Sequence, residues 1–161
     1  MKEDRVSVER VINCEAGEIF ALIADAGKHP SFDGSGTVRH APQDSIPLSP
    51  GSKFGMAMRW GLPYRTWGHL PLAGDNTVIE FEQHRLIAWQ TTVLGGLVGG
   101  RIWRYELSPT DGGTLVRETW DISKDRQRAW LKTSGMAKQT AQAMRKTLDR
   151  ITELLEKHSG G

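Results

Sequence analysis

Glu118 is the ionisable side chain of this sequence with the clearest opportunity for acid–base chemistry. It lies between Val116 and Trp120 in a stretch, residues 115–122, whose alternation predicts a strand. If Val116 and Trp120 point into the core, the two-residue period sends Glu118 inward with them, whereas the opposite orientation leaves it in solvent. A buried carboxylate must find a partner or become neutral, and this shifts its pKa.

Two further titratable side chains, Tyr105 and His29, are candidates for the same work if they face one interior with Glu118. We assign no catalytic residue beyond these three weak candidates. Arg59 and Arg104 fall on the outward faces of their predicted strands, where we expect simple solvation.

Other familiar catalytic signatures are missing from the sequence. The five histidines show no metal-ligand spacing and there is one cysteine, so we predict no metal site. The glycine pairs at 95–96 and 99–100 lack a following Gly-Lys-Ser/Thr, which argues against a phosphate-binding loop. The serines lack the Gly-x-Ser-x-Gly pattern of hydrolases. We expect no cofactor.

The elements that must position these residues are mostly strands. A strand, a helix that opens with acidic residues, and a short turn at His29-Pro30 come first, and several alternating stretches follow. Short spacing between the strands favours an antiparallel meander. Tyr64 to His69 is interpreted as a strand continuation and Pro71 to Asn76 as a turn. The predicted strands are 5–13, 36–41, 54–60, 78–82, 87–93, 101–108 and 115–122, with the first helix at 15–26.

The period changes to 3.6 residues after Ser123, which predicts a helical C-terminal region. Gly135 is expected to separate a short helix from a long amphipathic one. The apolar stripe of the long helix runs from Ala137 to Leu155. We expect its part from Leu148 onward to seal the core and its part from Met136 to Met144 to face a pocket.

Composition restricts the class of protein. The length of 161 residues suits one domain, residues 1–161, with a disordered tail at 158–161. No signal peptide and no membrane-spanning stretch is evident, so we expect a cytoplasmic protein without integral membrane association. Residues 124–161 carry nine basic and four acidic side chains, a net charge of +5. These basic residues lack interleaved aromatics, so we predict no nucleic-acid binding.

The order of elements and several motifs resemble the START/SRPBCC helix-grip superfamily, close to its polyketide cyclase/dehydrase-like branch, with a birch-pollen-allergen-like fold. The resemblance covers nearly the whole chain and rests on mainly structural motifs. These are VSVERVI (6–12), AGEIFALIAD (16–25), HPSFDG (29–34), IAW (87–89), WRYEL (103–107), GGT (112–114) and the terminal helix at 144–155.

The resemblance implies an α+β helix-grip fold, in which an antiparallel curved sheet of about seven strands wraps around a long C-terminal helix. Two short helices follow the first strand, and a cavity lies between sheet and helix. Members of the superfamily bind lipids, sterols, polyketides or similar molecules. No catalytic motif is shared across it, so the resemblance transfers no catalytic residue to this chain.

We therefore expect a monomer or homodimer that binds or transports a small hydrophobic molecule in an internal cavity, and we favour this over an enzyme. Large aromatic and thioether groups on strand faces fit a cavity wall, although taken alone such stripes are more typical of an ordinary packed core. The candidate ligand-binding residues are Phe32, Met56, Met58, Trp60, Tyr64, Trp89, Trp103, Tyr105, Glu118, Trp120, Met136 and Met144.

Two alternatives stay open. The first is a polyketide cyclase/dehydrase-type enzyme acting in the same cavity, which requires two of the titratable candidates to meet within hydrogen-bond reach. The second is a chaperone-activator-like protein-interaction module, which requires an exposed apolar patch. Trp67 and Trp130 are the tryptophans considered for such a patch, against the simpler interpretation of both as loop anchors.

Overall fold

The computed structural model describes the backbone of residues 3–36, 38–40, 44–60 and 70–159, and the side chains of 3–36, 44–55 and 74–157 within them. Tyr64 and Trp67 lie outside the described residues. The strands are β1 (Arg5–Ile12), β2 (Val38–His40), β3 (Lys53–Trp60), β4 (Leu70–Glu82), β5 (Leu86–Val93), β6 (Val98–Thr110) and β7 (Gly113–Asp121). The helices are α1 (Ala16–Ile23), α2 (His29–Phe32), α3 (Arg128–Thr133) and α4 (Met136–Ser159), with 3-10 turns η1 (Ala26–Lys28) and η2 (Leu94–Gly96).

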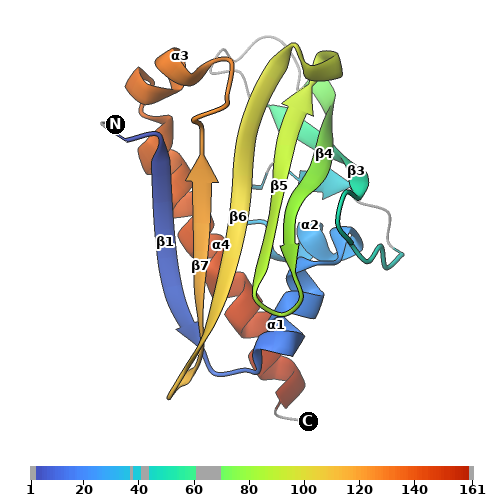
Figure 1. The fold of residues 1–161 in the computed structure, drawn as a ribbon, viewed down its shortest axis with the longest axis vertical. Helices are drawn as coiled ribbons and strands as arrows, with labels where there is room; N and C mark the ends of the chain where they lie inside the picture. The colour runs from blue at the N-terminus through green and yellow to red at the C-terminus, as the bar shows by residue number, and fades with distance from the viewer. Residues whose placement is uncertain (1–2, 37, 41–43, 61–69, 160–161) are drawn as a thin grey trace.

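One antiparallel sheet carries all the described strands in the order β1-β7-β6-β5-β4-β3-β2. Six of its strands have eight residues or more, and the edge strand β2 adds three. Figure 1 shows the strands β7 to β3 as a meander, while β1 pairs with β7. The predicted α+β helix-grip architecture is confirmed.

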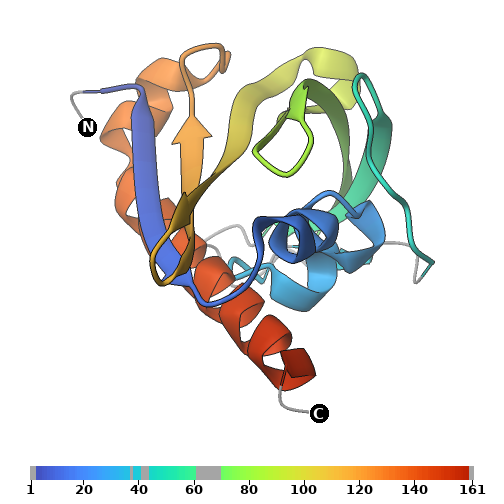
Figure 2. The ribbon, with the colours of Figure 1, turned by 60° about the horizontal axis from the view of Figure 1, so that its bottom comes forward.

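The crossing from β1 to the far edge of the sheet is made by α1, η1 and α2. Figure 2 shows the sheet as a curved wall, with α4 crossing its open side and α1 and α2 covering one end. The concave face must therefore be filled by side chains from the sheet, from α4 and from these short helices.

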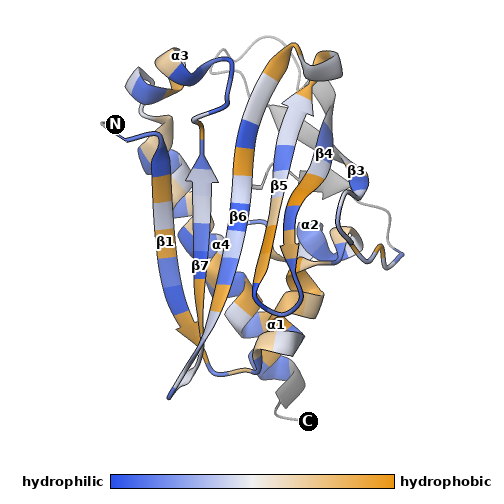
Figure 3. Ribbon diagram, in the orientation of Figure 1, coloured by the Kyte–Doolittle hydropathy of each residue, from blue (hydrophilic) through white to orange (hydrophobic). Residues whose placement is uncertain are grey.

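Alternation along the strands fills that concave face. Figure 3 shows apolar and polar residues in alternating bands along β1 and β6. In β7, Val116, Glu118 and Trp120 all lie inward and are buried, which settles the orientation that the sequence left open. Trp120 is paired with Trp103 of β6. Each large apolar side chain buried in this way contributes about 1.5–3 kcal/mol.

The C-terminal helical region divides where expected. Gly135 has a φ of 76°, which ends α3 and allows α4 to begin at Met136. Met144, Leu148 and Ile151 of α4 are fully buried against the sheet. The helix continues to Ser159, and residues 160–161 lie outside the described residues.

The prediction of a turn from Pro71 to Asn76 was wrong, because β4 runs through this stretch and pairs with β3 along its length. Asn76 was interpreted as a turn residue, yet its side chain is buried. Its amide donates to the backbone oxygen of Phe54 at 3.3 Å, and its oxygen accepts from Thr91 Oγ1 at 2.7 Å. These bonds remove the usual cost of an asparagine inside a strand.

The segment after α2 packs directly on α4 at Gly34. A Cβ at this position would lie 2.2 Å from the backbone oxygen of Ala143 and 2.5 Å from the nitrogen of Thr147. The Gly34 N–H donates to Thr147 Oγ1 at 2.9 Å, so the approach is also hydrogen-bonded. This contact fixes where α2 delivers its side chains into the concave face.

We expect Gly34→Ala to lower the free energy of unfolding by about 2 kcal/mol or more, because the new methyl group meets backbone atoms that cannot move aside. Urea unfolding measures this. Gly17→Ala in α1 is the matched control, since its Cβ finds only ordinary contact with His84 at 3.7 Å. That change should be neutral or stabilising by about 0.5–1 kcal/mol. Equal stabilities of Gly34→Ala and the unmodified protein would contradict the close approach.

Candidate ligand-binding site

Three neighbouring strands bring Glu118, Tyr105 and Trp89 together on the concave face. Tyr105 of β6 lies directly opposite Glu118 of β7 on one side and Ile87 of β5 on the other. Trp89 follows Ile87 by two residues, so the strand period places it on the same face, diagonal to Tyr105. The fourth residue of this group, His29, comes from helix α2 and not from the sheet.

These four side chains form a continuous column, which we call the aromatic column. The rings of Trp89 and Tyr105 stack with centroids 5.6 Å apart, and those of His29 and Trp89 stack at 5.0 Å. Tyr105 Oη donates a hydrogen bond to Glu118 Oε1 at 2.8 Å, which ends the column at β7. At the other end His29 Nε2 lies 2.8 Å from the backbone oxygen of Ile23.

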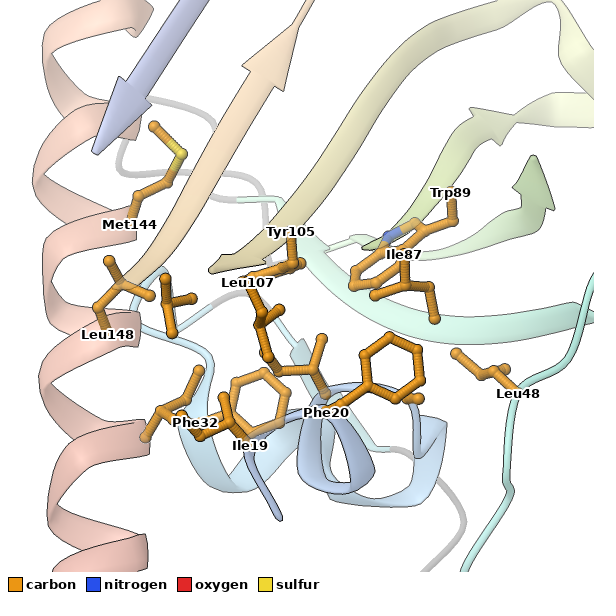
Figure 4. Close-up of a cluster of buried hydrophobic side chains, with 14 of the residues drawn as sticks. Ile19, Phe20, Phe32, Leu48, Ile87, Trp89, Tyr105, Leu107, Met144 and Leu148 are labelled. Carbon is orange, nitrogen blue, oxygen red and sulfur yellow. The ribbon is translucent and has the colours of Figure 1, made fainter. Parts of the chain in front are cut away.

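The aromatic column is buried. Glu118 is 3% exposed, Tyr105 4%, Trp89 5% and His29 3%. Figure 4 shows Trp89 and Tyr105 in one cluster with Phe20 and Phe32, while Met144 and Leu148 of α4 face them across the interior. The polar atoms of the column are therefore surrounded by apolar groups, where an unmade hydrogen bond is costly.

Two polar atoms of this column have no hydrogen-bond partner in the described part of the chain, namely Glu118 Oε2 and Trp89 Nε1. A buried polar group without a partner costs about 1–3 kcal/mol, so proteins seldom leave one unless a ligand or water completes it. The two atoms belong to the same column, in which Tyr105 lies between Trp89 and Glu118. They are the strongest structural indication of a binding function.

Burial sets the protonation state of the column. Desolvation raises the pKa of Glu118 from 4.5 to about 8, the hydrogen bond from Tyr105 opposes this, and the negative charge of Asp33 adds to it. Desolvation, followed by the charge and hydrogen bond of Glu118, also raises the pKa of Tyr105 well above 10. Desolvation lowers the pKa of His29, against the opposing effect of the Ile23 carbonyl. All three groups are therefore uncharged at pH 7.

This protonation state decides which atoms donate. Glu118 Oε1 accepts the Tyr105 hydroxyl, so the proton of the neutral carboxyl group is placed on Oε2. The indole Nε1 of Trp89 is a donor only. A carbonyl oxygen cannot donate to His29, so its Nε2 carries the proton. The two unpartnered atoms of the column, Glu118 Oε2 and Trp89 Nε1, are thus both hydrogen-bond donors.

The remaining predicted ligand-binding residues differ in how deeply they are buried and in whether their side chains are described. Phe32 and Met144 are buried, and Phe32 packs against the His29 ring at 5.4 Å. Trp120 is 1% exposed, while Trp103 and Met136 are half-buried and pack against the core. The backbone of Met56, Met58 and Trp60 lies in β3, but their side chains, like Tyr64, fall outside the described residues.

Sequence reasoning missed the buried pair Asn76 and Thr91. Both lie on the concave face, and their hydrogen bond joins β4 to β5 close to Trp89. The period of two, counted back from the inward Val78, would have placed Asn76 inward. The turn propensity of Gly74-Asp75-Asn76 obscured this signal.

Arg104 was expected to be simply solvated, and this was wrong. It forms an ion pair with Glu80 on the outer face of the sheet, with its side chain only 17% exposed. Two polar surface hollows lie away from the aromatic column, one beside β1 and α4 and one on this outer face. They are lined by exposed ion pairs such as Arg117 with Glu9, which contribute little to stability.

Within the described residues, no cluster of three or more histidine, cysteine, aspartate or glutamate side chains could hold a metal ion. The helices described here are also all too short or too polar to span a bilayer.

Comparison with known proteins agrees with this fold. Residues 3–156 match the family model described as polyketide cyclase / dehydrase and lipid transport. The chain belongs to this family, within the START/SRPBCC superfamily.

Relatives and solved structures extend the comparison. The Mycobacterium tuberculosis protein Rv0088 is 32% identical over 157 residues, a match that covers 92% of this chain and 63% of Rv0088. The chain thus spans 63% of the length of the curated relatives it matches. The crystal structure of NE0264 from Nitrosomonas europaea has a TM-score of 0.66 at 16% identity and covers 100% of this chain and 99% of its own. MLL2253 from Mesorhizobium loti has 0.64 at 14%, covering 95% and 97%. At these identities the two structures show the fold alone.

The raised pKa of Glu118 predicts a specific dependence of stability on pH. The folded state holds its proton up to about pH 8, whereas the unfolded chain releases it near 4.5. The contribution of Glu118 is therefore fully present below pH 4.5 and is lost as pH rises toward 8, by about 1.4 kcal/mol per unit.

Glu118→Gln keeps the acceptor for Tyr105 and removes the titration. We expect the free energy of unfolding of this variant, relative to the unmodified protein, to rise steadily between pH 5 and 8 in urea titrations. His29 titrates equally in both proteins and cancels from the difference. A pH-independent difference would show that Glu118 is solvated.

Proposed function

We propose that the protein binds an apolar small molecule that carries a carbonyl oxygen, held in the interior between the sheet and α4. The observation that supports this most is that two buried donors, Glu118 Oε2 and Trp89 Nε1, have no hydrogen-bond partner among the described residues. An apolar site with a few convergent polar groups is typical of a small-molecule pocket.

The donors favour an acceptor group on the ligand. A ketone, quinone or ester oxygen accepts two hydrogen bonds and has no proton to place in the site. The apolar remainder of such a molecule suits contacts with Phe32, Met144 and the Trp89 ring, which lie in the same buried cluster. Tyr105 acts indirectly, because its hydroxyl occupies Oε1 and leaves Oε2 to face the ligand.

Protonation of Glu118 then controls binding. Below about pH 8 the carboxyl group donates, and above it the carboxylate repels a carbonyl oxygen. Affinity for the carbonyl group should therefore fall as pH rises, while affinity for a purely apolar molecule should change little.

A matched pair of probes tests this proposal. Menadione and 2-methylnaphthalene share a bicyclic skeleton, and only the former carries carbonyl groups. We expect the protein to bind menadione at least about tenfold more tightly at pH 6.5, since one or two hydrogen bonds in a buried site contribute about 1–3 kcal/mol. Isothermal titration calorimetry measures both affinities.

Variants at position 118 provide the controls. Glu118→Gln retains a donor and should bind menadione with an affinity that no longer falls between pH 6.5 and 9. Glu118→Met removes one of the two donors at similar volume and should reduce the preference for menadione, while the Trp89 Nε1 donor remains. Equal affinity of the unmodified protein for both probes would exclude the carbonyl contact, and binding of neither would exclude this class of ligand.

A second function is favoured by the hydrogen bond between Tyr105 and Glu118. It satisfies the requirement that two titratable groups meet inside the fold, and a carboxyl group with a pKa of about 8 is a suitable general acid. A cyclase or dehydrase would use it to protonate a carbonyl or hydroxyl oxygen of a polyketide-like substrate. Turnover of a poly-β-ketone thioester, lost in Glu118→Gln, would distinguish this enzyme from a carrier.

A further inference from the structure

Three large apolar side chains are exposed at one end of the molecule. Leu94 is 60% exposed and Leu97 69% in the turn between β5 and β6, and Trp130 of α3 is 60% exposed. Figure 1 places the turn between β5 and β6 and helix α3 on the two sides of one end of the molecule, with α1 at the other end. We call these three residues the apolar tip. The simpler interpretation of Trp130 as a loop anchor was wrong.

The backbone conformation at Leu94 is unfavourable for a leucine. Leu94 has a φ of 52°, in the left-handed region, and is followed by Gly95 at 64° and Gly96 at 88°. A leucine is disfavoured in this conformation, where glycine fits without strain. The Leu94 side chain is also exposed, so core packing does not compensate the strain. A function for the side chain itself accounts for its presence.

The turn and the segment before α3 are joined rigidly. The Gly99 N–H donates to Gln127 Oε1 at 2.8 Å, and the Arg126 N–H donates to the Gly99 oxygen at 2.9 Å. Arg101 forms an ion pair with Asp125 at 2.9 Å, with the Asp125 side chain fully buried. The apolar tip is therefore presented by a fixed framework.

Positive charge surrounds the apolar tip. Residues 122–135 contain four basic side chains and one acidic one, Asp125, whose charge is balanced by Arg101. Lys124 and Arg126 are exposed, while Arg128 and Lys132 share Asp4. Two exposed carboxylates also lie at this end, Asp75 opposite Thr92 and Glu3 next to Asp4, so the excess of positive charge is small. This excess would still repel a second copy of the same surface.

We propose that this end of the protein docks on an anionic membrane surface, with Leu94, Leu97 and Trp130 entering the headgroup region and the basic side chains contacting the lipid phosphates. Leucine and tryptophan flanked by lysine and arginine suit the boundary between hydrocarbon and water. Docking of this kind would let an apolar ligand pass between the bilayer and the protein without crossing water.

Vesicle flotation tests the proposal. We expect the full chain to float with vesicles of phosphatidylcholine and phosphatidylglycerol and not with phosphatidylcholine alone. Binding should weaken in high salt, because salt screens the attraction between the basic side chains and the anionic lipid headgroups. Leu94→Gly combined with Leu97→Ser should reduce vesicle binding by about tenfold or more. Thermal stability should be unchanged or higher, since glycine relieves the strain at position 94.

Val11→Ser is the matched control, because Val11 is 49% exposed near the end of β1 at the opposite end of the sheet. This variant should bind vesicles as the unmodified protein does. The proposal is overturned if the protein does not float with phosphatidylglycerol vesicles. It is also overturned if Val11→Ser loses as much vesicle binding as the Leu94/Leu97 variant. Dimerisation that disappears in the Leu94/Leu97 variant would instead identify the tip as a self-association surface. None of these outcomes depends on which ligand the interior binds, so docking and ligand binding can fail separately.

Discussion

The hydrogen bond from Tyr105 to Glu118 is the interaction on which the chemistry of the interior depends. It joins two neighbouring strands inside the fold and gives one carboxyl oxygen a partner, while the other oxygen has none in the part of the chain that the structure describes. Desolvation keeps this carboxyl group neutral, so a residue that would otherwise repel an apolar ligand becomes a hydrogen-bond donor toward it. The stacked rings of Trp89 and His29 extend the same uncharged column toward α2.

The fold supplies this column through two different constraints. Register between β5, β6 and β7 places Trp89, Tyr105 and Glu118 on one face without further contacts. His29 reaches them only because α1, η1 and α2 cross from one edge of the sheet to the other and Gly34 allows a close approach to α4. The sheet therefore fixes the polar end of the column and the helices fix its aromatic end.

Local periodicity was enough to predict much of this. The break at Gly135, the inward-facing stripe of α4 and the strand around Glu118 follow from spacing alone. The period also placed Asn76 inward, but its turn propensity obscured the strand that two hydrogen bonds to distant residues stabilise. The ion pair of Arg104 with Glu80 depends on a contact between distant segments and could not be predicted. The stacking of His29 on Trp89 joins residues far apart in sequence, and no pattern in either segment indicates it.

Donation to a ligand requires Glu118 to be neutral and buried at physiological pH. The most direct measurement is the carboxyl carbon chemical shift of Glu118 in carbon-13-labelled protein, followed by NMR from pH 4 to 9 and assigned with Glu118→Gln. Our account predicts a single titration near pH 8. A titration near the ordinary glutamate value of 4.5 would contradict it, because the carboxylate would then be charged and solvated, and could not donate to a ligand.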